Sequence, residues 1–269
     1  MAHLSPLTTA GAPATTISMI DLTKRWPLGL NRQNWPDYLN VLLLALFVLL
    51  FLDAYVSQNL ISIAPVWREP FFFITDFGLS EWVLVPTLVV SVGCAIAWRL
   101  VPSGQPRRVT HEIGMVAGFA FLAVGVPGLI TNLLKRLFGR GRPAVFDESG
   151  AFDFQRIFND WTYQSFPSGH STTAIATALV VGFVAPRYFL LVFSIALMTG
   201  ISRIVVGDHY PTDVLAGFVV GALGAHAVRN LFARRRWLFA GTPGGRVRFR
   251  GLPALRRLYI RLHQRRARP

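Results

Sequence analysis

Long apolar runs separated by short polar connections dominate the chain, and this pattern predicts helices that cross a membrane. A membrane-spanning helix needs about 20 apolar residues, with a range of roughly 17–25. Three of the runs reach this length. The fourth and fifth are shorter and meet at Pro186, since a proline ends a helix and disfavours helical geometry in the residue before it. The six runs cover residues 38–56, 82–101, 112–134, 170–185, 188–202 and 212–228.

The composition agrees with a membrane protein. Hydrophobic residues make up 52% of the 269 residues and charged residues only 15%, whereas soluble domains carry about 25% charged residues. The single cysteine, Cys94, lies within an apolar run and excludes an intrachain disulfide framework. We therefore expect an all-α integral membrane protein with six transmembrane helices in one bundle. Its expected parts are a cytoplasmic segment over residues 1–36, a membrane domain over 37–228 and a basic cytoplasmic tail over 229–269.

The net charge of +14 is concentrated at one end of the chain. Of the 27 basic residues, 13 follow position 228, where no acidic residue occurs. This distribution indicates a cytoplasmic, lipid-facing or solvated tail rather than a nucleic-acid-binding surface. We therefore expect the lipid bilayer as a partner and no nucleic acid.

Helix lengths and loop charges predict the sidedness of the polar connections. At about 1.5 Å per residue, the run from Gly169 to Pro186 climbs roughly 25 Å, and the next run returns by a similar height. Connections rich in Arg and Lys are expected in the cytoplasm, and one of them carries Arg99, Arg107 and Arg108. Both termini are then cytoplasmic. The three polar clusters described next face the periplasm or exterior of what we expect to be a bacterial inner membrane.

The first polar cluster supplies fixed positive charge at the end of the third run. Lys135 and Arg142 are permanent cations, and a guanidinium matches phosphate with two parallel hydrogen bonds. Phosphoryl transfer needs such donors around the phosphate oxygens. Gly139 and Gly141 allow the segment to bend, and Pro143 fixes its exit. The structural alternative is a pair of cations that anchors a helix end against lipid headgroups.

The second cluster is Pro167-Ser168-Gly169-His170, directly before the fourth run. Backbone N–H groups at a helix N-terminus bind anions readily, and the Ser168 hydroxyl adds a donor. His170 titrates near neutrality and is suited to protonate a leaving alkoxide. The structural alternative is an interfacial histidine beside a capping serine.

The third cluster combines Arg203, His209 and Asp213 around a predicted helix start at Pro211, because proline suits the first helical position. Asp213 follows His209 by one helical turn and can orient its imidazole, as an aspartate does in hydrolytic triads. His209 can then attack phosphorus through its free nitrogen, while Arg203 binds the same phosphate. The structural alternative is an arginine that reaches the interface beside a surface His–Asp pair.

Other polar and aromatic positions receive structural interpretations. Asp53 and His226 each lie near the end of a run without an evident partner, and Asp208 has no role that the sequence assigns. Aromatic residues 66–82 suit the membrane interface, and residues 252–262 are typical of a membrane-surface helix. Simple packing and a solvated tail explain these two segments equally well.

The motifs Lys135-x6-Arg142-Pro143, Pro167-Ser168-Gly169-His170 and Ser202-Arg203-x5-His209-x3-Asp213 together resemble the three-part signature of the type 2 phosphatidic acid phosphatase superfamily. That group includes bacterial lipid phosphatases and soluble vanadium haloperoxidases. The motifs span residues 135–213 without a departure at any signature position, and the six-helix pattern extends the likeness over residues 38–228.

The resemblance implies an all-helical fold, a site within a helical and loop region at the outer membrane face, and no metal or other cofactor. It also implies roles for the motif residues. His209 would be the nucleophile, supported by Asp213, and His170 the general acid. The residues that would bind the phosphate are Lys135, Arg142, Ser168, Gly169 and Arg203.

The sequence thus predicts an integral membrane phosphatase that removes a phosphate or diphosphate group from a lipid headgroup through a phosphohistidine. The candidate substrates are a polyprenyl diphosphate, phosphatidylglycerol phosphate, phosphatidic acid and a lipid A-type glycolipid. The oligomeric state stays open.

Three alternatives remain at this point. A lipid-to-acceptor phosphotransferase would use the same clusters. A transporter or channel would guide anions with them, although we find no two related halves with broken helices. A metallohydrolase would use His170, His209 and Asp213 as ligands.

Overall fold

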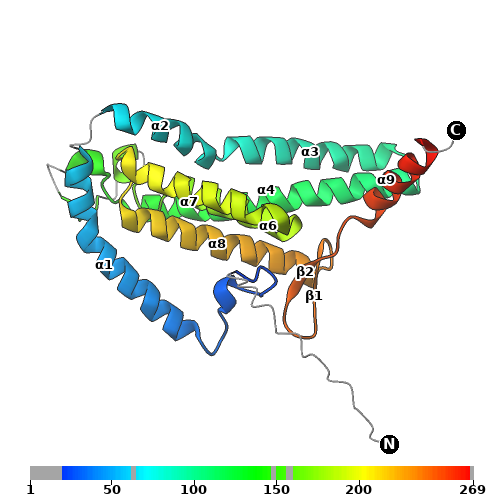
Figure 1. Ribbon diagram of the computed structural model, residues 1–269, viewed down its shortest axis with the longest axis horizontal. Helices are drawn as coiled ribbons and strands as arrows, with labels where there is room; N and C mark the ends of the chain where they lie inside the picture. The colour runs from blue at the N-terminus through cyan, green and yellow to red at the C-terminus, as the bar shows by residue number, and fades with distance from the viewer. Residues whose placement is uncertain (1–19, 62–64, 147–149, 156–159, 267–269) are drawn as a thin grey trace, which may run out of the picture.

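The computed structural model describes residues 20–61, 65–146, 150–155 and 160–266. Helices dominate this part of the chain (Figure 1). The α-helices are α1 (Trp35–Ile61), α2 (Pro65–Thr75), α3 (Glu81–Leu100), α4 (Gln105–Phe138), α6 (Gly169–Val184), α7 (Phe189–Val205), α8 (Pro211–Arg234) and α9 (Pro253–Arg266). Short 3-10 turns are η1 (Pro27–Gly29), η2 (Asp76–Gly78), η3 (Pro143–Val145), η4 (Trp161–Tyr163) and η5 (Pro186–Tyr188), and two strands are β1 (Phe239–Gly241) and β2 (Val247–Phe249).

The prediction of membrane-spanning helices agrees with the length and composition of five segments. They are long and apolar enough to cross a bilayer, and they cover Trp35–Val56, Val66–Leu100, Gln105–Phe138, Pro186–Val205 and Pro211–Arg234. The remaining predicted run forms α6, an apolar helix of 16 residues, so a sixth crossing stays a prediction. The prediction of an all-α fold is wrong in one detail, because β1 and β2 form an antiparallel hairpin in the tail.

The helices α4, α6, α7 and α8 lie side by side in the centre of the molecule (Figure 1). Two glycines let α8 approach α6 closely. A Cβ atom at Gly217 would lie 2.5 Å from the carbonyl oxygen of Ser168, and one at Gly221 would lie 2.5 Å from that of Thr172. Any larger side chain would separate the helices, so these glycines hold the start of α6 against α8.

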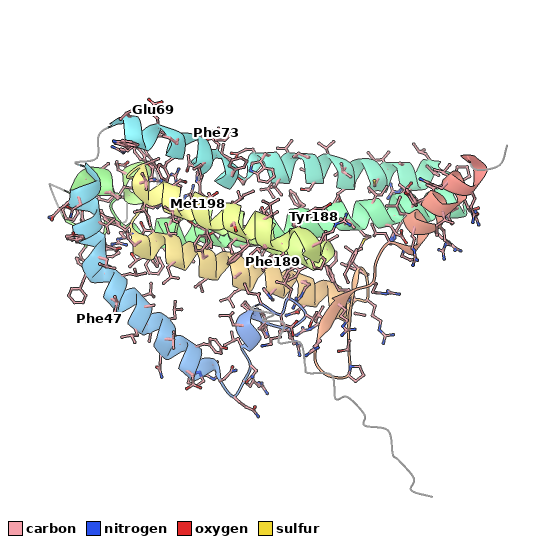
Figure 2. The ribbon with its side chains drawn as sticks, in the orientation of Figure 1. Phe47, Glu69, Phe73, Tyr188, Phe189 and Met198 are labelled. Carbon is pink, nitrogen blue, oxygen red and sulfur yellow. The ribbon has the colours of Figure 1, made fainter. Side chains whose placement is uncertain are left out.

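Helix α1 diverges from this centre and meets α8 near its own C-terminal end (Figure 1). Its apolar side chains, such as Phe47, project away from the bundle (Figure 2). This exposure suits contact with lipid. Among the α1 side chains that the structure describes, Asp53 alone is buried.

Both tails pack against the bundle, which the sequence analysis does not predict. Helix α8 continues past the expected boundary at residue 228 to Arg234. The ring of Phe239 is buried beside Phe119 of α4. The guanidinium of Arg229 donates to the carbonyl oxygens of Leu22, Lys24 and Arg25.

Candidate active site

The connection between α4 and α6 is folded tightly enough to fix its arginines. Gly139 ends α4 in the left-handed region, at φ 63°, and its N–H donates to the carbonyl oxygen of Lys135 at 3.0 Å. Glycine adopts this conformation at no steric cost. Beyond it, Gly141 donates to Asp153 at 2.8 Å and the Arg142 backbone donates to Thr162 at 2.8 Å. The bend expected at Gly139 is therefore present.

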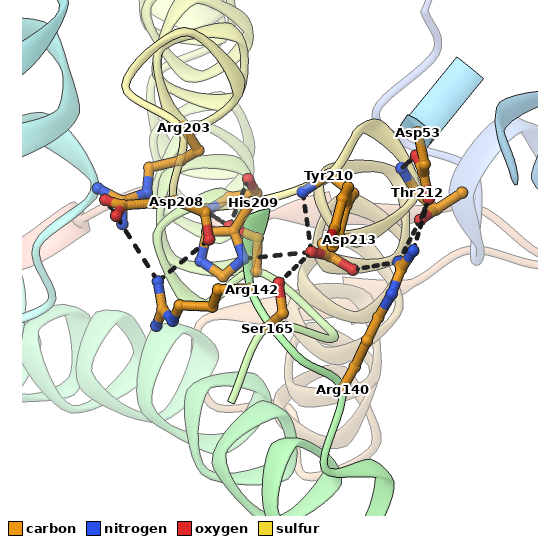
Figure 3. Close-up of polar contacts among 12 residues, drawn as sticks. Asp53, Arg140, Arg142, Ser165, Arg203, Asp208, His209, Tyr210, Thr212 and Asp213 are labelled. Atoms are coloured by element: carbon orange, nitrogen blue, oxygen red, sulfur yellow. Dashed lines mark hydrogen bonds and ion pairs between the residues drawn. The ribbon is translucent and has the colours of Figure 1, made fainter. Parts of the chain in front are cut away.

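Three cations gather around His209. Lys135, Arg142 and Arg203 each lie close enough to lower its pKa, and Lys135 and Arg203 are themselves almost fully buried. Figure 3 shows the imidazole between Asp213 on one side and Arg142 and Arg203 on the other. The structure thus brings together residues that lie up to 74 positions apart, from Lys135 to His209.

Asp208 links two of these cations. Its Oδ2 atom lies 2.5 Å from Nη2 of Arg203, and its Oδ1 atom lies 3.9 Å from Nη1 of Arg142. The backbone carbonyl of Asp208 also accepts a hydrogen bond from Arg142 at 3.2 Å. The sequence left this residue without a role, and the structure shows that it holds both guanidinium groups beside His209.

His209 is 2% exposed and approaches Asp213 through one ring nitrogen. Its Nδ1 atom lies 3.5 Å from Oδ2 of Asp213, although the geometry of this approach is not that of a hydrogen bond, and Nδ1 has no hydrogen-bond partner in the described part of the chain. Burial lowers the pKa of His209 well below its ordinary value, and the nearby cations lower it further. The imidazole is therefore neutral near pH 7, with Nε2 directed away from the carboxylate.

The second cluster forms the start of α6. The Ser168 hydroxyl accepts a hydrogen bond from the backbone N–H of Ser171, so this serine caps the helix. A Cβ atom at Gly169 would lie 3.6 Å from Nζ of Lys135. The side chain of His170 packs directly against Gly78 of η2, and it lies near enough to His209 to influence its pKa.

The aromatic segment 66–82 covers the site. The Thr75 hydroxyl accepts a hydrogen bond from Nη1 of Arg203 at 2.6 Å. Gly78 allows the chain to lie on His170, because a Cβ atom there would stand 2.6 Å from the Cβ of the histidine. The sequence predicts an interfacial position for this segment but not these two contacts.

A buried ionic network holds the Asp213 carboxylate through the oxygen that does not face His209. Nη1 of Arg140 lies 2.7 Å from Oδ1 of Asp213, and Nη2 lies 2.8 Å from Oδ2 of Asp53. The backbone N–H and hydroxyl of Thr212 also donate to Asp53. Asp213 further accepts hydrogen bonds from the Ser165 hydroxyl and the Tyr210 backbone. All three charged groups of this network are at most 2% exposed.

The prediction that Asp53 has no partner is therefore wrong. The sequence analysis also assigned no role to Arg140. One signal was available, because a carboxylate within an apolar run requires a buried cation. His226 was also expected to lack a partner, but its Nδ1 atom lies 2.8 Å from the carbonyl oxygen of Ala222, and its ring packs edge-on against Phe183.

An apolar cavity of about 640 Å³ begins at Ala174 of α6, one helical turn beyond His170. On one side the lining consists of aromatic side chains of the segment 66–82, namely Phe73, Phe77 and Trp82, together with Asp76 and Glu81. On the other side α6 and α7 contribute Ala174, Val181 and Ile195. Val181 lies about 16 Å further along α6 than His170, at about 1.5 Å per residue. The cavity therefore extends along α6 in the direction away from the polar cluster.

The surroundings of the site do not suit a metal ion. The described residues contain no group of three or more His, Cys, Asp or Glu side chains arranged to hold one. The carboxylate of Asp213 is already bound by Arg140. Lys135, Arg142 and Arg203 would repel a divalent cation at His170 and His209. The chemistry of these side chains favours an anion instead.

The chain is similar to known proteins. The model of the PAP2 superfamily matches residues 116–237. The lipid A 1-phosphatase of Rhizobium johnstonii is 32% identical over 228 residues, which cover 83% of this chain and 93% of that protein. The phosphatidylglycerophosphatase B of Bacillus subtilis is 27% identical over 183 residues, or 64% of this chain and 78% of that protein.

A crystal structure of a transmembrane PAP2-type phosphatidylglycerolphosphate phosphatase from Bacillus subtilis aligns with a TM-score of 0.48 at 23% identity, over 72% of this chain and 95% of that one. The sequence identity to the Rhizobium protein extends over most of both chains. On this ground the resemblance seen in the three motifs is confirmed, and the protein belongs to the PAP2 superfamily.

Proposed function

We propose that the protein is an integral membrane phosphatase that hydrolyses a phosphate or diphosphate group on a lipid headgroup. The balance of charge around His209 carries this proposal. Counted together with the buried network behind Asp213, the four cations Lys135, Arg140, Arg142 and Arg203 outnumber the three carboxylates Asp53, Asp208 and Asp213. A phosphate monoester carries about −1.5 to −2 charges near pH 7 and complements this excess.

His209 is the proposed nucleophile. Its Nδ1 side faces Asp213, so Nε2 is the nitrogen that attacks phosphorus. The bond between phosphorus and the lipid oxygen breaks, and its electron pair leaves with that oxygen. The imidazole gains positive charge in this step, and the Asp213 carboxylate stabilises it. The lowered pKa of His209 leaves the nitrogen unprotonated and available.

His170 is the proposed acid and base. In the first step it protonates the departing lipid oxygen, and the product is a phosphohistidine on His209. In the second step it removes a proton from a water molecule that attacks phosphorus. The bond between phosphorus and nitrogen then breaks, inorganic phosphate leaves and His209 is again neutral. Ser168 and Gly169 would bind the phosphate at the start of α6, together with the three cations.

The apolar cavity that begins one helical turn beyond His170 supports a lipid as the substrate, because it places hydrocarbon-compatible surface within about 6 Å along α6 of the proposed phosphate-binding cluster. The names of the two relatives point to a lipid A 1-phosphate and to phosphatidylglycerol phosphate for those proteins. For this chain the substrate is one of these lipid classes, a polyprenyl diphosphate or phosphatidic acid. We propose no metal or other cofactor.

The site faces the periplasm of a bacterial inner membrane in this proposal, and both termini are cytoplasmic. The distribution of arginines supports this orientation, since Arg99, Arg107, Arg108 and the basic tail lie at the end of α4 away from Lys135.

The test is a phosphate-release assay with the purified full-length protein in detergent, using one lipid of each of the four classes. His209→Ala is the variant, and His263→Ala, an exposed histidine on α9, is the matched control. The proposal is supported if the wild type and the control release phosphate from at least one lipid and His209→Ala does not. Wild-type rates in His209→Ala on every lipid overturn the mechanism. Product analysis with a second lipid acceptor distinguishes hydrolysis from the alternative phosphotransferase.

A further inference from the structure

The C-terminal helix α9 is fixed to the bundle through its first turn. Both carboxylate oxygens of Glu112 accept hydrogen bonds from the backbone N–H of Ala254, at 2.9 and 3.1 Å, and one also accepts from Leu255 at 3.0 Å. The side-chain amide of Gln105 donates to the carbonyl of Ala254 at 2.5 Å. Helix α9 therefore has a defined position on the start of α4.

This position lies at a membrane surface. Gln105 and Lys135 are both on α4, and at about 1.5 Å per residue they are roughly 45 Å apart. A bilayer with its headgroup regions is about 40–45 Å thick. Figure 1 shows α9 across the ends of α3 and α4, at the end of the bundle away from α1 and α2. Helix α9 thus belongs at headgroup level in the leaflet opposite the candidate active site.

The outer side of α9 combines apolar and basic side chains. Leu252 packs against the core, whereas Tyr259, Ile260 and Leu262 are exposed. The exposed side chains Arg256, Arg257 and Arg261 stand among them. Arginines beside exposed apolar groups are typical of helices that lie in the surface of an anionic membrane.

A basic cavity of about 320 Å³ opens between α9 and the α3–α4 turn. Its lining includes Arg107, Arg108, His111 and Arg257, together with Trp98. The guanidinium of Arg107 stacks on the Trp98 ring at 4.0 Å, and its Nε atom is buried without a hydrogen-bond partner in the described part of the chain. The carboxylate in the lining, Glu112, is already bound to the α9 backbone. The cavity is thus positively charged and suits an anionic headgroup.

We infer that α9 and this basic cavity bind anionic phospholipid in the leaflet opposite the candidate active site. The phosphate of a headgroup would lie against the arginines, and Tyr259, Ile260 and Leu262 would enter the interfacial layer. Charge complementarity selects this occupant over a neutral lipid. Each arginine near an anionic surface strengthens such binding about fivefold at low ionic strength.

The test uses the full-length chain in lipid nanodiscs made of phosphatidylcholine alone or with phosphatidylglycerol added. The single cysteine is removed by Cys94→Ser, and Leu262→Cys receives an environment-sensitive fluorophore. In the anionic discs we expect a blue-shifted emission of the fluorophore and quenching of this emission by spin-labelled lipid. Both effects decrease when salt rises from about 0.05 M to about 0.5 M, because screening shortens the reach of charge.

A variant with Arg256→Gln, Arg257→Gln and Arg261→Gln should lose the anionic-lipid response by roughly two orders of magnitude in lipid affinity. Arg248→Gln, an exposed tail arginine on β2 outside the cavity, is the matched control and should retain the response. Phosphate release from a water-soluble substrate reports that each variant is folded, independently of α9.

Any of the following outcomes would overturn the inference. One is an equal emission shift in neutral and anionic discs. Another is an unchanged response in the triple variant. The third is the same shift produced by soluble glycerol phosphate, which would make the cavity a site for a free anion, or by adding further protein copies per disc, which would make α9 a contact between chains.

Discussion

Arg140 binds one oxygen of Asp213 while His209 approaches the other. Nη1 of Arg140 lies 2.7 Å from Oδ1, and Nδ1 of His209 lies 3.5 Å from Oδ2. The same guanidinium lies 2.8 Å from Asp53. Two buried carboxylates therefore share one buried cation, and the orientation of Asp213 depends on a residue of α1.

Replacement of Arg140 by methionine should be strongly destabilising. It would leave Asp53 and Asp213 buried without their cation, and removal of one partner from such a network costs about 3–5 kcal/mol. Thermal or denaturant unfolding in detergent measures the effect. Arg187→Met, at an exposed arginine in η5, should unfold like the wild type. Equal stability of both variants would show that the network contributes nothing to folding.

Replacement of Asp213 by asparagine should reduce kcat by a factor on the order of 10⁴, the loss seen when a triad aspartate is changed in this way. An amide neither stabilises the imidazolium nor balances Arg140. Phosphate release at saturating substrate measures kcat. Asp37→Asn, at an exposed aspartate on α1, is the control. An Asp213→Asn enzyme with a normal kcat would exclude any support of His209 by this carboxylate.

Replacement of Arg142 by glutamine should weaken inhibition by inorganic phosphate about 10- to 100-fold, because a hydrogen bond to a charged group contributes about 1.5–3 kcal/mol. The guanidinium stands beside Asp208 and lies close enough to His209 to lower the pKa of that histidine. The inhibition constant for phosphate is the measurement, and Arg187→Gln serves as the control. An unchanged constant would place Arg142 outside the phosphate-binding group.

The pH profile should reflect the lowered pKa of His209. Burial and the neighbouring cations hold this pKa well below its ordinary value of 6.5. The neutral, nucleophilic imidazole therefore persists as the pH falls through 6.5, and the acid limb of kcat/KM lies below that pH. In Arg142→Gln one cation is absent, so the pKa rises and the acid limb moves to higher pH.

The same substrate is used for both enzymes in this comparison, so its own ionisation cancels in the difference between the two profiles. If the acid limb of the kcat/KM profile stays in place or moves to lower pH in Arg142→Gln, His209 is not the titrating nucleophile.

Chelators should leave the activity unchanged, and vanadate should inhibit it. Lys135, Arg142 and Arg203 repel a divalent cation, whereas the vanadate anion suits the same three charges. Phosphate release after dialysis against a chelator, with and without vanadate, is the measurement. A chelator-sensitive enzyme restored by a divalent ion would favour the metallohydrolase alternative.

The sequence predicted the polar clusters well because helix length and crossing direction determine which loops meet. Lys135, His170 and His209 follow from that reasoning and lie together in the structure. Their chemical roles stay proposals. Spacing along the chain carried no comparable signal for Asp53 and Arg140, which are 87 residues apart and meet only because α1 packs on the start of α8.

The packing of the two tails against the bundle was not predicted for a related reason. Phe239 lies in the short apolar run Trp237–Ala240 and Val247 stands between two arginines, and neither stretch is long enough to show a periodic pattern that marks it as buried. Their burial depends on a surface that α4, α6 and α8 create together. A tertiary surface of this kind has no counterpart in a local stretch of sequence.

The contacts of Arg229 also bear on how the protein is made. Its guanidinium binds the carbonyl of Leu22, 207 positions earlier in the chain. The backbone of Thr23 also accepts a hydrogen bond from Val247 of the hairpin. A ribosome delivers these partners more than 200 residues after Leu22 and Thr23. Leu22 and Thr23 must therefore wait through most of membrane insertion, and their docking is a late event of biogenesis.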